Sequence, residues 1–478
     1  MWKAAHALLL LTCLIAYVAA HEHHDEVSEE EMKAPVDKIL WLHMLVQGIV
    51  WGVMFPIGMV LGLSRSRWHV PLQATGYALT IGGYILGHSH KGRAFPPSAH
   101  GSFANILMIP ILAQLVIGIY LKLHIHEKSI RPYIVPLHGV IGKLYPILGW
   151  VQMLFGAIVF RGYCRGGALG QCLAHYIMGS GFIAYAVLMT IIMLVGEQWI
   201  RRVGRSPEFF DSSVITVWGI VNTFTEHHGG EWSVKDMQHT ILGVLWWAGG
   251  ILGIYLARNN QRNVVPGVII FLTGWAMSEH AQALMLSTKV HAMFGRTLML
   301  AGITRIIEVC YFVPTYASDG ADDDTNSEHT LADGTNPRGS FSGRTLAAKS
   351  FSYVTPFLLV SAGILFMSAT DEELKYVHEN DMDHVTYILI WFSFAFLLYA
   401  FIVFLVNLYA TSGRNAPAVK VNRLDDSNIE MVTPGGRTKW YSRVPLRGNS
   451  QPTHVLGDED EDEDMMAPQP LGGGVNRR

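Results

Sequence analysis

The chain has 478 residues, of which 50% are hydrophobic and only 15% are charged, whereas about a quarter of residues are charged in soluble proteins. The formal net charge is −3, and the acidic run at 458–464 carries seven negative charges, so the remainder stands at −3 + 7 = +4. This composition predicts a polytopic protein embedded in a lipid bilayer, and it gives no support for nucleic-acid binding.

Residues 1–20 have the pattern of a secretory signal peptide, with a basic Lys3, an apolar core and small residues at the end. An uncleaved anchor helix is the alternative. Cleavage would leave residues 21–38 as a short polar lumenal segment. Its free amine, with His21 first and His23 third, could bind Cu(II) in square-planar geometry, although a solvated polar terminus is the other interpretation.

Apolar segments of membrane-spanning length recur along the rest of the chain. They predict an all-α transmembrane helical bundle of about eleven spans. The expected spans are 39–63, 70–88, 99–124, 134–160, 172–196, 213–224, 239–257, 264–286, 290–313, 351–370 and 384–409.

Basic residues set the expected orientation, because cytoplasmic loops are enriched in Lys and Arg. Such residues follow the first, third and fifth spans, for example Arg65, Arg67 and Arg131. The N-terminus is therefore expected outside or in the lumen, and the C-terminus in the cytoplasm. Residues 314–349 are expected to be a flexible cytoplasmic loop, and 411–478 a disordered acidic cytoplasmic tail. A signal peptide and this topology predict a membrane of the secretory pathway, such as the plasma, vacuolar or endosomal membrane.

Two cysteines, Cys164 and Cys172, share a short Gly-rich loop on the expected oxidising side. A disulfide between them is therefore predicted.

One histidine lies near the beginning of each of the first four spans. In antiparallel helices these beginnings alternate between the two membrane faces, so His43 pairs with His100 on the outside, and His69 pairs with His138 on the inside. Opposed histidines in a helical bundle are the axial ligands of b-type haem. Small residues on the same helical faces, such as Gly142 beside His138, would admit a flat cofactor. Four interfacial histidines bonded to loops or headgroups are the alternative.

The first half also resembles a known family. The sequences Leu42-His43, Val50-Trp51-Gly52 and Phe55-Pro56-Ile57-Gly58, followed by His69-Val70 and His138-Gly139, are similar to the cytochrome b-561 family in its DOMON-associated branch. The resemblance implies a transmembrane core at 39–205 that holds two b haems on the four histidines. It also implies electron transfer from a cytoplasmic reductant, often ascorbate, to an outer acceptor such as a ferric or cupric ion. Residues 21–38 leave no room for a DOMON domain.

An anionic reductant would need cationic residues near the inner haem. The candidates, which are also ordinary positive-inside residues, are Arg65, Arg67, Lys128, Arg131 and Lys143.

In the second half, a further set of histidine and glutamate side chains is expected to lie at the outer face of the membrane. They are expected to bind copper, zinc or iron, or to form a hydrogen-bonded polar rim. The set is Glu226, His227, His228, His239, Glu279, His280 and His291. Arg305 and Glu308, one turn apart in an apolar helix, are expected to form an ion pair.

The sequence Gly274-Trp275-Ala276-Met277-Ser278-Glu279-His280-Ala281-Gln282, with Lys289-Val290-His291, resembles the C-terminal domain of fungal Ytp-like membrane proteins. This domain is expected at 206–313, with two further helices at 350–410. The predicted function is a dihaem transmembrane electron carrier, which would make the protein an oxidoreductase of the ferric or cupric reductase type. A haem-free, His-rich membrane protein that binds or transports a metal ion is the alternative. A homodimer remains open.

Overall fold

The computed structural model describes residues 27–227, 231–279, 282, 284–312, 348 and 350–416. The predicted signal peptide, the N-terminal histidines His21 and His23, the 314–349 loop apart from residue 348, and the tail beyond residue 416 lie outside the described residues. Within the described part the chain is helical and contains no strand, so the all-α prediction is confirmed. A short helix, α2 (Glu29–Lys33), lies in the segment that the sequence analysis left without structure.

The first long segment is a helix interrupted by a π-helical turn. It consists of α3 (Lys38–Ile49), η1 (Val50–Met54) and α4 (Phe55–Leu63). Asp37 is the N-cap of α3, and its Oδ1 accepts a 2.9 Å hydrogen bond from the backbone amide of Leu40. The π turn widens the helix at Trp51, a buried residue, and such turns are frequent at functional sites.

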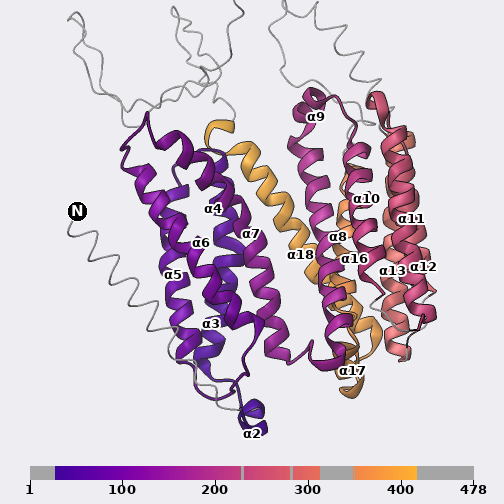
Figure 1. Ribbon diagram of the computed structural model, residues 1–478, viewed down its shortest axis with the longest axis horizontal. Helices are drawn as coiled ribbons and strands as arrows, with labels where there is room; N and C mark the ends of the chain where they lie inside the picture. The colour runs from indigo at the N-terminus through magenta and orange to yellow at the C-terminus, as the bar shows by residue number, and fades with distance from the viewer. Residues whose placement is uncertain are drawn as a thin grey trace, which may run out of the picture. The chain divides into compact units, whose positions relative to one another are not determined.

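Three more helices complete the first group, which Figure 1 shows in indigo and purple. They are α5 (His69–Ser89), α6 (Ala99–Lys122) and α7 (Arg131–Arg161). α3 and α4 pack on α5, and α6 packs on α7, so the group consists of two antiparallel helix pairs.

An aromatic core joins these two pairs at mid-height. The Trp51 ring packs at 5.5 Å from Tyr145 and its Nε1 donates a 2.8 Å bond to Thr80 Oγ1. The hydroxyls of Tyr77 and Tyr145 are bonded at 2.9 Å. Buried rings whose polar atoms are hydrogen-bonded hold the centre of the group together.

The second group follows in the chain and contains most of the remaining elements. They are η2 (Gly166–Ala168), α8 (Leu169–Val195), α9 (Glu197–Val203), α10 (Pro207–Thr225), α11 (Val234–Leu256), η3 (Arg258–Asn260), α12 (Val265–Ser278), α13 (Met285–Ile307), η4 (Glu308–Phe312) and α16 (Val354–Met367). Its helices meet at glycines: a Cβ built on Gly274 of α12 would lie 2.5 Å from the carbonyl oxygen of Gly295 on α13. Such close backbone contact is how small residues pack membrane helices.

A buried ionic cluster joins α10, α13, the start of η4 and the segment between η3 and α12. The predicted bond of Arg305 to Glu308 is present at 2.9 Å, but Arg305 also binds Glu208 at 2.9 Å and Asp211 at 3.0 Å. Arg262 binds the other side of Glu208. The cluster therefore pairs three carboxylates with two guanidinium groups, which offsets much of the cost of burying them.

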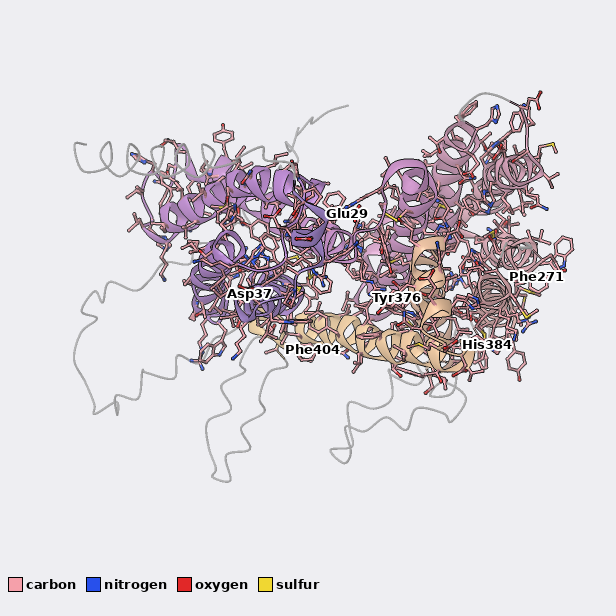
Figure 2. All side chains as sticks on the ribbon, turned by 90° about the horizontal axis from the view of Figure 1, so that it is seen from below. Glu29, Asp37, Phe271, Tyr376, His384 and Phe404 are labelled. Carbon is pink, nitrogen blue, oxygen red and sulfur yellow. A yellow bond between two sulfur atoms is a disulfide. The ribbon has the colours of Figure 1, made fainter. Side chains whose placement is uncertain are left out.

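Three further elements end the described part of the chain. They are α17 (Asp371–Glu379), α18 (His384–Thr411) and the short η5 (Gly413–Asn415). α18 contacts α4, α8 and α16, and Figure 2 shows it from His384 past Phe404. At its far end Ser412 Oγ bonds Ser64 Oγ at 2.7 Å, and the Arg414 amide donates to Ser64 O at 2.8 Å. Gly413 allows this approach because its φ is +57°.

Seven of the described helical segments are long and apolar enough to cross a membrane: Lys38–Leu63, Ala99–Lys122, Arg131–Arg161, Gly166–Val195, Asp236–Leu256, Ser350–Met367 and His384–Thr411. The other four predicted spans correspond to α5, α10, α12 and α13, which are shorter or more polar. The count of about eleven crossings thus remains a prediction for these four helices. α10 begins at Pro207, earlier than the expected 213, because Pro207 suits a helix start.

Candidate functional site

Two pairs of opposed histidines define the site in the first group. The rings of His43, on α3, and His100, on α6, have centroids 6.3 Å apart and planes at 89°. The rings of His69, on α5, and His138, on α7, have centroids 6.2 Å apart and planes at 88°. Each pair therefore takes one histidine from each antiparallel helix pair, and the two pairs have the same geometry.

Hydrogen bonds orient these rings. His43 Nδ1 donates to the Gly83 carbonyl and His69 Nδ1 donates to the Gly58 carbonyl, both at 2.7 Å. Because a carbonyl only accepts, Nδ1 carries a proton, and in the neutral ring Nε2 is then an acceptor. A backbone carbonyl on the far ring nitrogen is the usual arrangement for a histidine that binds a metal.

The rings on α6 and α7 are held in a related way. His100 Nδ1 donates at 3.2 Å to the carbonyl of Gln152, whose amide nitrogen returns a 3.0 Å bond to the His100 carbonyl. Gln114 makes the matching 2.9 Å bond to the His138 carbonyl. The Nδ1 of His138 is buried, and the described residues give it no hydrogen-bond partner.

A glycine of the neighbouring helix lies against every one of these imidazoles. A Cβ built on that glycine would lie 2.7 Å from His43, 2.8 Å from His69 and 3.1 Å from His100. The glycines are Gly87, Gly62 and Gly156 for these three, and Gly118 at 3.6 Å for His138. Side chains at the first three positions would displace the rings, so glycine is what admits them.

The two pairs lie near opposite ends of the helices. His43 is near the start of α3, whereas the carbonyl that binds His69 belongs to Gly58 on α4. The fifteen residues between them rise about 22 Å at 1.5 Å per residue. The aromatic core of Trp51, Phe55 and Tyr145 occupies the intervening space.

The basic residues proposed to receive an anion surround the end that carries His69 and His138. Arg65, Arg67, Lys128 and Lys143 are exposed, and Arg131 is half-buried. Arg131 bonds the Leu121 carbonyl at 3.1 Å and the ring of His124 at 3.0 Å. Arg67 lies over the Trp68 ring at 5.5 Å. These contacts fit ordinary loop residues as well as an anion-attracting surface.

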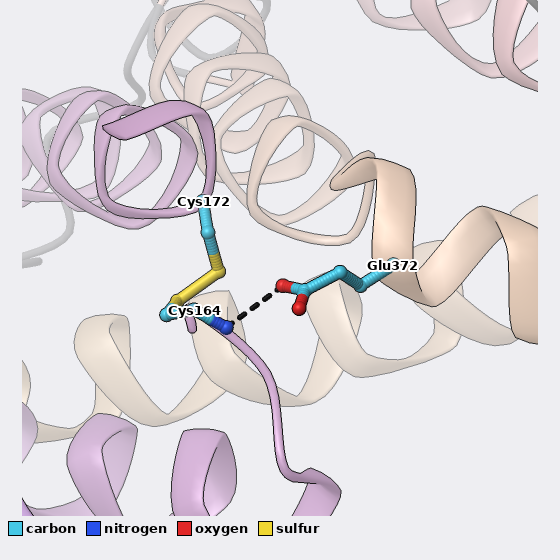
Figure 3. Close-up of side chains that lie close together, drawn as sticks. All are labelled: Cys164, Cys172 and Glu372. Atoms are coloured by element: carbon cyan, nitrogen blue, oxygen red, sulfur yellow. Dashed lines mark hydrogen bonds between the residues drawn. A yellow bond between two sulfur atoms is a disulfide. The ribbon is translucent and has the colours of Figure 1, made fainter. Parts of the chain in front are cut away.

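The structure contains the Cys164–Cys172 disulfide, which Figure 3 shows beside Glu372 of α17. Glu372 accepts a 2.8 Å bond from the Cys164 amide. These are the one set among the described residues in which three metal-ligating groups converge, but sulfurs in a disulfide are not thiolate ligands. Glu372 could not be predicted from the sequence, since its partner lies 208 residues away.

A second bond network supports this loop. Arg161 pairs with Glu373 at 3.0 Å, and the Tyr163 hydroxyl donates to the same carboxylate at 2.8 Å. Burial, and then this bond, raises the pKa of Tyr163, so its hydroxyl stays protonated and can keep donating.

The proposed outer metal ligands of the second half are only partly brought together. His239 bonds Glu226 at 2.6 Å, whereas His227 stacks on Trp232 at 3.9 Å. Glu279 is exposed. Of the same set, His228 and His280 lie outside the described residues.

His291 is instead buried, with 2% of its surface exposed, and it faces His175 of α8. His175 was missed by the sequence analysis. The signal was a histidine inside an apolar segment, one turn after Cys172.

Comparisons with known proteins identify the family. Residues 148–410, more than half of the chain, match the family model described as "Protein YTP1-like, C-terminal". This chain belongs to the YTP1-like family. Residues 7–124 match a second model, described as "Domain of unknown function (DUF2427)". The YTP1-like match is wider than the 206–313 range in which the motifs were recognised, and it reaches α18.

Three curated proteins are similar to this chain. "Protein YTP1" of Saccharomyces cerevisiae is 41% identical over 277 residues, which are 57% of this chain and 54% of that protein. "Uncharacterized membrane protein C3B8.06" of Schizosaccharomyces pombe is 21% identical over an alignment 488 residues long, which covers 75% of this chain and 91% of that protein. "Uncharacterized membrane protein YCR061W" of S. cerevisiae is 27% identical over 197 residues, 35% of this chain and 27% of that protein. The chain thus matches about half the length of YTP1. No solved structure matches. Together these findings make the chain an integral membrane protein in contact with lipid.

Proposed function

We propose that this chain is a dihaem b-type transmembrane electron carrier, with His43 and His100 as ligands of one haem, and His69 and His138 as ligands of the other. The observation that carries the proposal is the duplicated histidine geometry, with ring centroids at 6.3 and 6.2 Å. Two opposed imidazoles bound to one metal place their centroids about 6.2 Å apart, from a metal–nitrogen distance of about 2.0 Å and about 1.1 Å from nitrogen to ring centre. Both pairs fit one iron between their rings.

The surroundings of the pairs also fit haem. A glycine lies where a larger side chain would displace the ring of His43 or His69, and Nδ1 of both is occupied by a carbonyl. Nδ1 of His138 is also buried, and the described residues give it no hydrogen-bond partner. The chain has no C-x-x-C-H sequence for covalent attachment, so b-type haem is the form that the residues suit.

Bound haem would supply a one-electron couple of its iron. The residues of this chain would hold each group between two helix pairs and fix the imidazole planes. The rings of Trp51, Phe55, Tyr77 and Tyr145 would exclude water between the two ends. With two haems, an electron would cross the membrane in several short transfers and not in one long one.

The orientation proposed from the basic loops places His69 and His138 on the cytoplasmic side. Arg65, Arg67, Lys128, Arg131 and Lys143 would then attract an anionic reductant such as ascorbate, through charge and not through a built pocket. The outer acceptor would be a metal ion, Fe(III) or Cu(II), which makes the proposed activity that of a ferric or cupric reductase.

An absorption spectrum of the purified full chain tests the proposal. We expect the Soret and α bands of a reduced b cytochrome, with two haems per chain. Proteoliposomes loaded with ascorbate should then reduce an external ferric chelate, and a His69→Ala variant should not. The matched control is His88→Ala, an exposed histidine at the end of α5.

A protein without haem bands would contradict the proposal. The competing function is binding or transport of a metal ion without redox chemistry, and the buried contact of His175 with His291 is the observation in its favour. Metal uptake into the proteoliposomes without chelate reduction would establish that alternative.

A further inference from the structure

The ionic cluster of the second group is one positive charge short of neutrality. It contains three carboxylates, Glu208, Asp211 and Glu308, and two guanidinium groups, Arg262 and Arg305. With all five ionised, the cluster has a net charge of −1. A buried charge in a membrane protein is costly unless a cation neutralises it, and such groups often mark ion or proton sites.

The cluster lies close to one end of its helices. Glu208 and Asp211 are the second and fifth residues of α10, and Arg305 is the third residue from the end of α13. α10 follows the fifth predicted span, on the side that the basic residues predict to be cytoplasmic. The Arg262 side chain is 30% exposed, whereas Glu208 is 0% exposed. The cluster therefore reaches solvent through Arg262.

Asp211 is the carboxylate with the least compensation. Glu208 is bonded by both guanidinium groups, whereas Asp211 is bonded by Arg305 alone. Glu308 has the same single partner, but its side chain is 14% exposed, against 4% for Asp211. Because water stabilises the charged form least at Asp211, a proton bound by the cluster is expected there.

The neighbours of Asp211 suit both a charged and a neutral carboxyl. The titratable groups that face it are Glu208 of its own helix, Arg305 of α13 and Tyr185 of α8. α11, which packs extensively on α10, meets it at glycines such as Gly250. The Tyr185 hydroxyl is buried, and a hydroxyl can donate to a carboxylate or accept from a carboxylic acid.

A buried donor of the cluster points to an enclosed water. Arg305 donates from its two terminal nitrogens to the three carboxylates, but the described residues give its Nε no hydrogen-bond partner. Only 7% of this side chain is exposed. Buried polar groups of this kind are usually satisfied by ordered water. A water at Nε would lie within the cluster, where it can pass a proton from the Arg262 side to Asp211.

We propose that this cluster binds one exchangeable proton on the Asp211 carboxyl, taken up from the cytoplasmic side. A hydronium ion gives its proton to the carboxylate and leaves as water, so the net charge of the cluster changes from −1 to zero and no electron moves. A metal ion fits less well, because among the described residues the three carboxylates do not converge on one point. The site does not depend on the proposed haems, since none of its residues belongs to their histidine pairs.

The test is infrared difference spectroscopy of the full chain in lipid nanodiscs between about pH 5 and pH 8, where exposed carboxyls stay ionised. We expect the carbonyl stretch of a protonated carboxylic acid at the lower pH, its loss at the higher pH, and a shift of the band in heavy water. Asp211→Asn should abolish the band. The matched control is Asp381→Asn, an exposed carboxylate after α17, which should keep it.

Thermal unfolding gives a second readout. The wild type should lose stability as the pH rises over this range, because the deprotonated cluster carries a buried negative charge, whereas Asp211→Asn should lose none. Tyr185→Phe keeps the carboxyl but removes a donor to its charged form, so the band should disappear at a higher pH than in the wild type. This variant keeps the test open if Asp211→Asn fails to fold, which size-exclusion profiles report.

Three outcomes would overturn the proposal. They are an acid band that persists in folded Asp211→Asn, a band with an unchanged midpoint in Tyr185→Phe, and a wild-type melting temperature that depends on sodium at constant pH and ionic strength. The last result would make a metal cation the occupant. Haem content is measured separately, so failure here is distinguishable from failure of the haem proposal.

Discussion

The imidazole planes of His69 and His138 stand at 88° to each other across a centroid distance of 6.2 Å. The planes of His43 and His100 stand at 89°. The relative angle of two axial imidazoles determines how the iron d orbitals split, and perpendicular rings leave two of them nearly degenerate.

We therefore predict that the oxidised protein shows highly anisotropic low-spin ferric signals in electron paramagnetic resonance at low temperature. His100→Ala should remove the signal of the outer haem and leave the inner one, and His138→Ala should do the reverse. A rhombic spectrum typical of parallel imidazoles would contradict the ring geometry, and loss of both haems from either variant would contradict their independence.

The glycines beside the ligands give a second prediction. A Cβ at Gly87 would lie 2.7 Å from His43 Cε1, so Gly87→Ala should displace that ring and lower the occupancy of the outer haem severalfold. Gly82 lies on the same helix with open space around it, and Gly82→Ala is the matched control. Haem content by absorbance measures both. Equal haem content in the two variants would mean that His43 has room to move.

The start of α3 gives a pH-dependent prediction. Hydrogen bonds from the backbone amides of Leu40 and Lys91 hold the pKa of the Asp37 carboxyl below its ordinary value of 3.8. A lowered pKa means that the carboxylate stabilises the folded protein above pH 3.8, and that this contribution is lost as the pH falls through the folded value. When the Soret absorbance of the bound haem is followed during acid titration, it should therefore show loss of the outer haem as the pH falls below 3.8.

Asp37→Asn removes the charge and keeps one acceptor for the Leu40 amide. We expect this variant to lose the outer haem more readily at neutral pH and to show a weaker dependence on pH below 4. An acid transition with the same midpoint and steepness as the wild type would assign the pH dependence to another group.

The pairing of the four histidines in the first group could be predicted from the sequence, because it follows from alternating helix ends alone. The hydrogen bonds and glycines that hold each ring could not, since Gly87 contacts His43 from another helix, 44 positions along the chain. Spacing within one helix had pointed to Gly142 beside His138, whereas in the structure a Cβ there would contact Gln114.

The second half was harder to predict for the same reason. His291 was assigned to an outer rim because it begins a helix, but its partner His175 is 116 residues away and shares no motif with it. Likewise, Arg305 and Glu308 were recognisable as neighbours on one helix. Glu208 and Asp211, which also bind Arg305, come from α10, and its beginning was placed too late to include them.

This ionic cluster gives the last prediction. Only 7% of the Arg305 side chain is exposed, and its partners Glu208 and Asp211 are 0% and 4% exposed. Removing one partner of a buried pair leaves an uncompensated charge and costs about 3–5 kcal/mol. Arg305→Met should therefore lower the stability of the second group by about this amount, measured by thermal unfolding in detergent.

Arg296 is exposed on the same helix, and Arg296→Met should change the stability little by comparison. Adding Asp211→Asn to Arg305→Met removes one of the carboxylates left uncompensated, so the double variant should regain part of the loss, while Glu208 keeps its pair with Arg262. A double variant less stable than Arg305→Met alone would show that Asp211 acts through its other neighbours. If Arg305→Met were as stable as the wild type, the carboxylates of Asp211 and Glu308 would have lost their charge by taking up protons.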